Sequence, residues 1–193
     1  MTDWSWLLAR PTPNTYCLTF VYGMAPAELI RKFGMHSETA EELTPEEAST
    51  ELVGETRWPW MRIGEFNGWA FAIEDGHTEG LRLGGELSDN TQALVIVYVS
   101  EKALGHVAYY VDAELVTSFE PMAAYQRSGA DPDRFVDAMR EAGLPMEPDQ
   151  EPDVDPDLAA LRAFEVALGI GLPDEAEHGR LLTAEWIPPW LRD

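Results

Sequence analysis

Residues 60–73, WMRIGEFNGWAFAI, contain two runs of strand-forming side chains on either side of Asn67-Gly68. This dipeptide favours a positive φ at both positions, which is the geometry of a type I′ hairpin turn. The first run alternates between two faces: Trp60, Arg62, Gly64 and Phe66 fall on one, and Met61, Ile63 and Glu65 on the other. The stretch therefore predicts a β-hairpin.

Further strands and helices are expected around this hairpin. Residues 15–22 are nearly all strand formers, and residues 93–99 are apolar on both faces, which is typical of a central strand. Two more strands are expected near 106–111 and 114–119, and helices over 25–33, 44–53, 131–143, 158–168 and 174–182. We therefore predict an α+β fold, an antiparallel β-meander of about five to six strands with helices packed on it and a helical C-terminal third.

The clearest helix start is Thr44-Pro45-Glu46-Glu47. Thr44 can cap the helix, proline suits the first helical position, and Glu47 completes a capping box. The helix that follows is expected to end near Leu52 or Val53.

An acidic, proline-rich segment divides the chain. Residues 145–156 hold Glu147, Asp149, Glu151, Asp153 and Asp155 and no basic residue, a composition typical of a solvated linker. We expect an α+β core domain over 1–145, a linker over 146–157, and a C-terminal helical segment over 158–193 that packs on the core.

The charge of the chain is strongly negative, with 35 acidic against 13 basic residues and a formal net of −22 on 193 residues. A field of this sign repels nucleic acid and anionic lipid and favours cationic partners. Apart from Lys32 and Lys102 the basic residues are all arginines, and Gly and Pro number 15 and 14. This composition is typical of a GC-rich genome, although acidity with scarce lysine is also the pattern of a salt-adapted protein.

The sequence predicts a cytoplasmic protein outside the membrane. No apolar run approaches the roughly 20 residues that span a bilayer, and the first residues lack the basic start and apolar stretch of a signal peptide. Cys17 is the only cysteine, which excludes an intramolecular disulfide and a cysteine-based zinc site.

Motifs for catalysis, metals and cofactors are incomplete. Gly169-Ile170-Gly171 leaves a helix instead of entering one, so it does not fit a dinucleotide-binding turn. The acidic run that begins at Asp153 has Leu158 where a calcium loop needs glycine. No serine lies in a Gly-x-Ser-x-Gly elbow. We therefore predict no catalytic residue, no metal and no cofactor.

Two residue groups remain as candidates for function. Glu74 and Asp75, at the exit of the hairpin and close to His77, are the first carboxylates to examine for acid–base chemistry. Tryptophan and arginine crowd the hairpin, and both types are enriched in interface hot spots, although strand aromatics also pack cores. The candidate binding residues are Trp58, Trp60, Arg62, Trp69 and Glu74.

Several stretches resemble an uncharacterised protein family common in high-GC Gram-positive bacteria. The stretches are Tyr16 to Gly23 running into residues 25–34, then Gly68 to Glu74, and then Ser118 to Pro121 followed by Ser128 to Asp133. The resemblance covers most of residues 14–170. None of these motifs is catalytic in kind, so the resemblance implies genome origin and domain extent and assigns no functional residue.

Two classes of function follow from these observations. The first is a non-enzymatic binding or regulatory protein that neutralises a cationic protein partner, as immunity proteins do with basic toxins. The alternative is a small hydrolase or transferase that uses carboxylates and a histidine, which a pocket containing Glu74 or His77 would favour. The sequence leaves the oligomeric state open.

Overall fold

The structure is a computed structural model that describes residues 2–9, 15–35, 40–51, 60–99 and 104–185. Its helices are α1 (Ser5–Leu8), α2 (Pro26–Lys32), α3 (Pro45–Glu51), α4 (Glu79–Leu87), the 3₁₀ helix η3 (Pro121–Gln126), α5 (Val136–Ala142), α6 (Pro156–Leu168) and α7 (Glu175–His178). Its strands are β1 (Thr15–Tyr22), β2 (Glu41–Leu43), β3 (Trp60–Phe66), β4 (Trp69–Asp75), β5 (Gln92–Val99), β6 (Leu104–Val111), β7 (Glu114–Phe119) and β8 (Leu181–Glu185).

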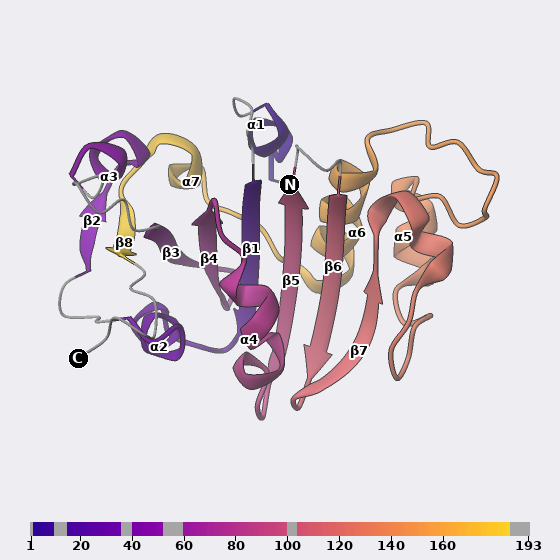
Figure 1. Cartoon of the computed structure of the whole chain (residues 1–193), viewed down its shortest axis with the longest axis horizontal. Coiled ribbons are helices and arrows are strands. Elements are labelled where there is room, and N and C mark those ends of the chain that lie inside the picture. The colour runs from indigo at the N-terminus through magenta and orange to yellow at the C-terminus, as the bar shows by residue number, and fades with distance from the viewer. Residues whose placement is uncertain (1, 10–14, 36–39, 52–59, 100–103, 186–193) are drawn as a thin grey trace.

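All eight strands join one antiparallel sheet in the order β2-β8-β3-β4-β1-β5-β6-β7 (Figure 1). The α+β class and the antiparallel sheet are confirmed. The sheet is larger than the predicted five to six strands, because β2 and β8 extend it at one end. It is also not a simple meander, since β1 lies between β4 and β5 and pairs with both, so that Phe20 stands opposite Phe71 on one side and Leu94 on the other.

The predicted hairpin is confirmed. Phe66 and Trp69 pair at its end, and the turn residues Asn67 and Gly68 have φ values of 50° and 79°. A second turn of this kind joins β6 to β7 at Asp112 and Ala113, with φ values of 49° and 66°. Both turns match the right-handed twist of the strands that they connect.

Helices cover both faces of the sheet, and each face has its own apolar core. In Figure 1, α4 lies in front of the sheet and α6 behind it. The rear face packs alternate residues of the central strands, such as Phe20 and Phe71, against α1, α5 and α6. The front face packs the intervening residues against α2 and α4. Because side chains alternate along a strand, the same strand serves both cores.

The predicted capping box is confirmed at the start of α3. The Thr44 hydroxyl accepts from the Glu47 amide at 3.1 Å, and a Glu47 carboxylate oxygen accepts from the Thr44 amide at 2.9 Å. The end expected near Leu52 or Val53 falls outside the described residues, and α3 is described as far as Glu51.

The acidic segment before α6 is fixed to the rear core at its beginning. Leu144 and Pro145 are buried, and Asp155 caps α6 by accepting from the amides of Asp157 and Leu158 at 2.9 and 3.1 Å. Helix α6 belongs to the same apolar cluster as β1, β4, β5 and β6. Residues 181–185, which we placed in a helical segment, instead form β8 between β2 and β3.

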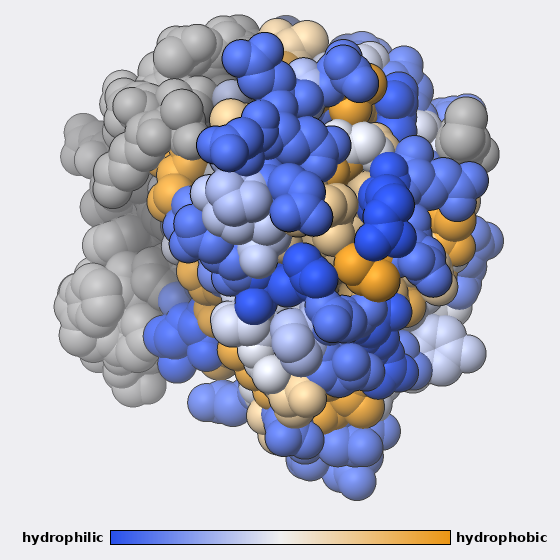
Figure 2. Space-filling view, turned by 90° about the vertical axis from the view of Figure 1, so that its right-hand side faces the viewer, coloured by the Kyte–Doolittle hydropathy of each residue, from blue (hydrophilic) through white to orange (hydrophobic). Residues whose placement is uncertain are grey.

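The surface on the side of β7 and α5 is mostly hydrophilic, with small separate apolar areas (Figure 2). Among the described residues, the exposed large apolar side chains come from separate parts of the chain: Tyr22, Leu104, Met122, Val154 and Val166. No helix in the described part of the chain is long and apolar enough to cross a membrane.

Candidate functional site: a tryptophan-lined pocket

Two of the predicted binding residues, Trp60 and Arg62, line a pocket of about 300 Å³ on the rear face of the sheet. The pocket lies where β3 and β4 meet α1, α7 and the first residue of α3. Its lining residues are Trp6, Ala9, Pro45, Trp60, Arg62, Ile73, Asp75, Glu177 and His178. The alternation predicted for residues 60–66 places Trp60 and Arg62 on this face, and Met61 and Ile63 in the front core.

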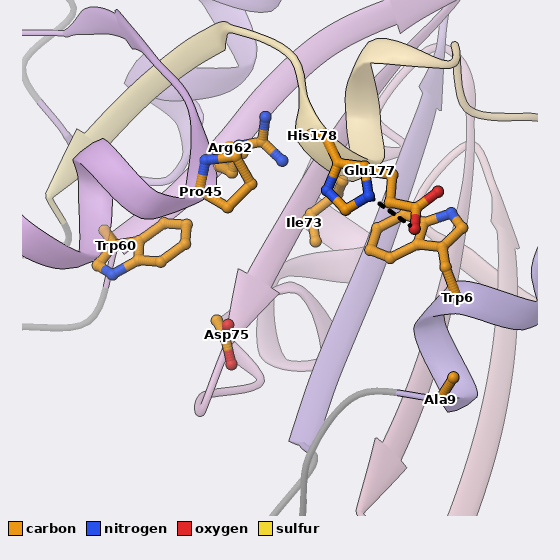
Figure 3. Close-up of a pocket in the computed structure, with 9 residues that line it drawn as sticks. All are labelled: Trp6, Ala9, Pro45, Trp60, Arg62, Ile73, Asp75, Glu177 and His178. Carbon is orange, nitrogen blue, oxygen red and sulfur yellow. Dashed lines mark ion pairs between the residues drawn. The ribbon is translucent and has the colours of Figure 1, made fainter.

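Aromatic and acidic side chains line much of this pocket. In Figure 3 the Trp60 and Trp6 side chains lie on opposite sides, and Asp75 lies between them near the lower rim. Both indoles are half-buried. Oε1 of Glu177 lies 3.1 Å from Nε2 of the exposed His178, which is ion-pair distance. A ligand in the pocket would therefore meet two indole rings, two carboxylates and the imidazole of His178, with the guanidinium of Arg62 at the base.

Arg62 lies at the base of the pocket, where it holds neighbouring elements together. It is 3% exposed. Its guanidinium donates to the carbonyls of Ala176 and Gly179, both at 2.6 Å, and at 3.5 Å to that of Glu175. Carbonyls at the end of a helix lack partners within the helix and favour a nearby cation. Arg62 thus fixes the end of α7 against β3, and α7 in turn carries Glu177 and His178 into the pocket.

Trp69 lies apart from the pocket and belongs to the rear core. Its ring is 3% exposed and meets Tyr22 edge-on, with 5.2 Å between the ring centroids. Its indole nitrogen donates to the carbonyl of Leu168 at 3.2 Å, which ties β4 to the end of α6. This arrangement matches the core-packing alternative for strand aromatics. Trp58 lies outside the described residues.

Glu74 points away from the pocket into the front face and is fully buried. Its carboxylate accepts from the amides of Glu79 and Gly80 at 2.7 and 2.9 Å, and its Oε2 lies 2.6 Å from Nδ1 of His77. The Thr19 hydroxyl adds a contact at 3.5 Å. Glu74 therefore anchors the first turn of α4 to the sheet.

The expected Glu74–Asp75 pair is separated by strand geometry. Neighbouring residues on a strand point to opposite faces, so Asp75 faces the pocket while Glu74 faces α4. The two carboxylates cannot act on one substrate atom. Glu74 and His77 do contact each other. Neither residue lines any of the five pockets considered in the described part of the chain.

Cys17 lies beside Glu74 and is fully buried. Burial, followed by the negative charge of Glu74, raises the pKa of its thiol well above the ordinary value. A thiol held in its protonated form is a poor nucleophile and a poor metal ligand. Among the described residues, no three His, Cys, Asp or Glu side chains gather as metal ligands.

Trp6, Glu177 and His178 are pocket residues that sequence reasoning missed. They lie on the short helices α1 and α7, more than 50 residues from Trp60 in either direction. Nothing in their local sequence signals a site. The pairing of β8 with β3 and the hydrogen bonds of Arg62 to the end of α7 bring these residues to the hairpin.

These features define a class: α+β proteins with an eight-stranded antiparallel sheet, helices on both faces and a tryptophan-lined pocket near one end. A family model matches residues 1–170, and the chain belongs to this family, the family of unknown function DUF6461. The resemblance to an uncharacterised family is thereby confirmed. No curated protein and no solved structure matches the chain. The matched residues include the pocket residues up to Asp75, whereas Glu177 and His178 lie beyond them.

Proposed function

We propose that this protein binds a cationic side chain of a protein partner in the tryptophan-lined pocket and catalyses no reaction there. The observation that carries the proposal is the lining itself, in which Trp6 and Trp60 lie on opposite sides of the pocket with the carboxylates of Asp75 and Glu177 on its wall. Aromatic faces attract Lys and Arg side chains, and the attraction grows when the cation is desolvated. The pocket volume of about 300 Å³ suits one long side chain.

The distribution of charge supports a basic partner. Among the acidic side chains that the structure describes, Glu74 alone is fully buried, and the others present their charge at least partly to solvent. Such a field speeds the approach of a basic protein and repels nucleic acid. In this proposal the long-range field brings the partner close and the pocket selects one of its side chains.

The contacts of Glu74 and His77 disfavour the alternative, a hydrolase that uses these two residues for catalysis. Both oxygens of Glu74 accept backbone amides of α4, and its side chain has no exposed surface. A general base needs to reach a substrate atom within hydrogen-bond distance. The structural role of this pair favours binding over catalysis at this place.

The proposal extends to the source organism of the protein, its cellular location and its biological role. We infer a protein of a high-GC Gram-positive bacterium, because the stretches quoted above resemble a family common in such bacteria and arginine greatly outnumbers lysine. We infer a cytoplasmic location because a single cysteine cannot form an intramolecular disulfide. An immunity-like role, in which the acidic protein neutralises a basic toxin, fits the charge and the pocket. Electrostatic complementarity of this kind sets association rate and specificity.

The proposal is tested by binding of a fluorescein-labelled pentapeptide that has one central arginine between glycines and serines, followed by fluorescence anisotropy. Wild-type protein is expected to bind it. Trp60→Leu should weaken binding about tenfold, because the cation loses an aromatic face. Glu177→Gln should weaken it less, since this carboxylate is partly exposed to solvent.

Matched variants separate the pocket from the general field. Glu175→Gln removes the same charge two residues away on α7, outside the pocket lining, and Tyr22→Leu removes a half-exposed aromatic ring elsewhere. Both should leave binding unchanged. At 0.5 M salt all affinities fall because distant charges are screened, but the ratio of wild type to Trp60→Leu should persist. Equal weakening by the pocket variants and their controls would refute the pocket as the binding site.

A further inference from the structure

A second pocket, of about 280 Å³, lies at the other end of the sheet, over β6 and β7. Its lining is mostly polar and consists of His106, Ser118, Phe119, Glu120, Ala123, Gln126 and Ser128. None of these residues belongs to the tryptophan-lined pocket. The inference drawn from it goes beyond the proposed binding function and does not depend on it.

Strand register brings a serine and a histidine together in this pocket. Ser118 on β7 stands opposite Ala108 on β6, and His106 lies two residues from Ala108 on the same face. Such diagonal neighbours are within reach of a long side chain. The Ser118 hydroxyl and Nε2 of His106 are 3.2 Å apart, which is hydrogen-bond distance.

The chain itself closes the pocket next to Ser118. After η3 it returns along the outer edge of β7, where Ser118 and Ser128 exchange two backbone hydrogen bonds of 2.8 and 2.9 Å. This returning segment passes close to the carbonyl of Val116. A Cβ at Gly129, whose φ is 124°, would lie 2.3 Å from that carbonyl oxygen, so only glycine fits there. The polar side chains of Gln126 and Ser128 are therefore held beside the Ser118–His106 pair.

The environment of His106 suits a base at neutral pH. Its imidazole is half-buried, and burial lowers its pKa below the ordinary value, while the negative charge of Glu120 acts in the opposite direction with smaller effect. The ring is thus largely neutral at pH 7. In the tautomer that carries its proton on Nδ1, Nε2 is free to accept the proton of the Ser118 hydroxyl.

We propose that Ser118 is a nucleophile that takes the acyl group of a small carboxylic ester, with His106 as its general base. A hydroxyl within hydrogen-bond reach of a neutral imidazole, both lining a pocket, is the arrangement that activates serine in acyl transfer. Oγ of Ser118 forms a bond to the ester carbonyl carbon as its proton passes to Nε2. The bond from that carbon to the alcohol oxygen then breaks, and the leaving oxygen takes the proton from His106. Water, deprotonated by Nε2 of His106, then attacks the acyl-serine carbonyl. The bond from that carbon to Oγ breaks, Oγ takes the proton back from His106, and the acid leaves.

The experiment treats the folded full-length protein with a fluorophosphonate probe, which reacts with activated serines, and locates the adduct by peptide mass spectrometry. We expect the adduct on Ser118. His106→Gln keeps a polar side chain but removes the base, so the labelling rate should fall about 100-fold. A burst of p-nitrophenol from p-nitrophenyl acetate, stoichiometric with protein, should accompany acylation of the same serine.

The control is Ser128→Ala, which removes a second hydroxyl that lines the pocket and leaves the backbone pairing of the return segment in place. This variant should label like wild type, whereas Ser118→Ala should not label. Mapping the adduct on the wild-type protein needs no variant to fold. Absence of an adduct on Ser118, an adduct on another serine, or an unchanged rate in folded His106→Gln would each overturn the proposal.

Discussion

At the scale of single residues, the buried carboxylate of Glu74 holds the first turn of α4 to the sheet. It is fully buried, and two backbone amides and His77 contact it. We predict that Glu74→Gln lowers the free energy of unfolding by about 2–3 kcal/mol, because a charged acceptor is lost and an amide NH₂ must face an amide N–H. Chemical denaturation with circular dichroism measures this loss.

The control for this variant is Glu86→Gln, which makes the same chemical change on the exposed side of α4. Its effect is expected to stay within about 0.5 kcal/mol. Hydrogen exchange at the amides of Glu79 and Gly80 should become faster in Glu74→Gln and remain slow in the control. A Glu74→Gln protein as stable as wild type would show that the carboxylate does not anchor α4.

At the scale of elements, the first turn of α6 holds an acidic group in an unfavourable position. Asp157 packs against Gly105, and burial, with a smaller contribution from the charge of Asp155, raises its pKa to about 6. Its ordinary pKa is 3.8. Between these values the folded protein binds more protons than the unfolded chain, so its stability falls as the pH rises. Above about pH 6 the full cost is present.

Asp157→Asn removes this cost. Because the carboxyl group is partly exposed, solvent reduces the gain to about 1 kcal/mol. Melting temperatures measured from pH 4 to pH 8 should coincide with wild type near pH 4 and exceed it at pH 7. Asp153→Asn, at an exposed position in the segment before α6, serves as control and should show no such trend. A variant that melts below wild type at pH 7 would contradict the stated cause of the pKa shift.

Local chemistry made most elements predictable. The hairpin turn follows from Asn67-Gly68 and the start of α3 from Thr44 and Glu47, because both signals lie within four residues. Helix α4 gave no such signal. It contains three glycines, which are poor helix formers, and it exists because Glu74 holds its first turn and Gly84 lets the Tyr110 ring lie against it.

The site was predictable only in part, because its residues are brought together by contacts between distant parts of the chain. Strand alternation correctly places Trp60 and Arg62 on one face, but it cannot tell that Arg62 serves the end of α7 or that Trp69 bonds to Leu168. Strand β8 was missed because its short run, Leu181 to Glu185, lacks a turn signal of its own. It becomes a strand by pairing with β2 and β3.

At the scale of the whole molecule, the net charge acts on the rate of association, and the tryptophan-lined pocket acts on recognition. The chain carries a net charge of −22, and among the described acidic side chains all but Glu74 are partly or fully exposed, so their field acts at a distance and salt weakens it. The tryptophan-lined pocket acts in contact and is half-enclosed by α1, α7 and the sheet. A partner should therefore associate faster at low salt, while its recognition depends on one inserted cationic side chain.

The most direct measurement is the ratio of two dissociation constants, for the pentapeptide with a central arginine and for the same peptide with citrulline, which has nearly the same shape and no charge. The tryptophan-lined pocket predicts that arginine binds at least about tenfold more tightly at 0.5 M salt, and that Trp60→Leu removes most of this preference. Equal affinity of the two peptides for wild-type protein, or a preference that Trp60→Leu leaves intact, would contradict recognition of a cation in this pocket.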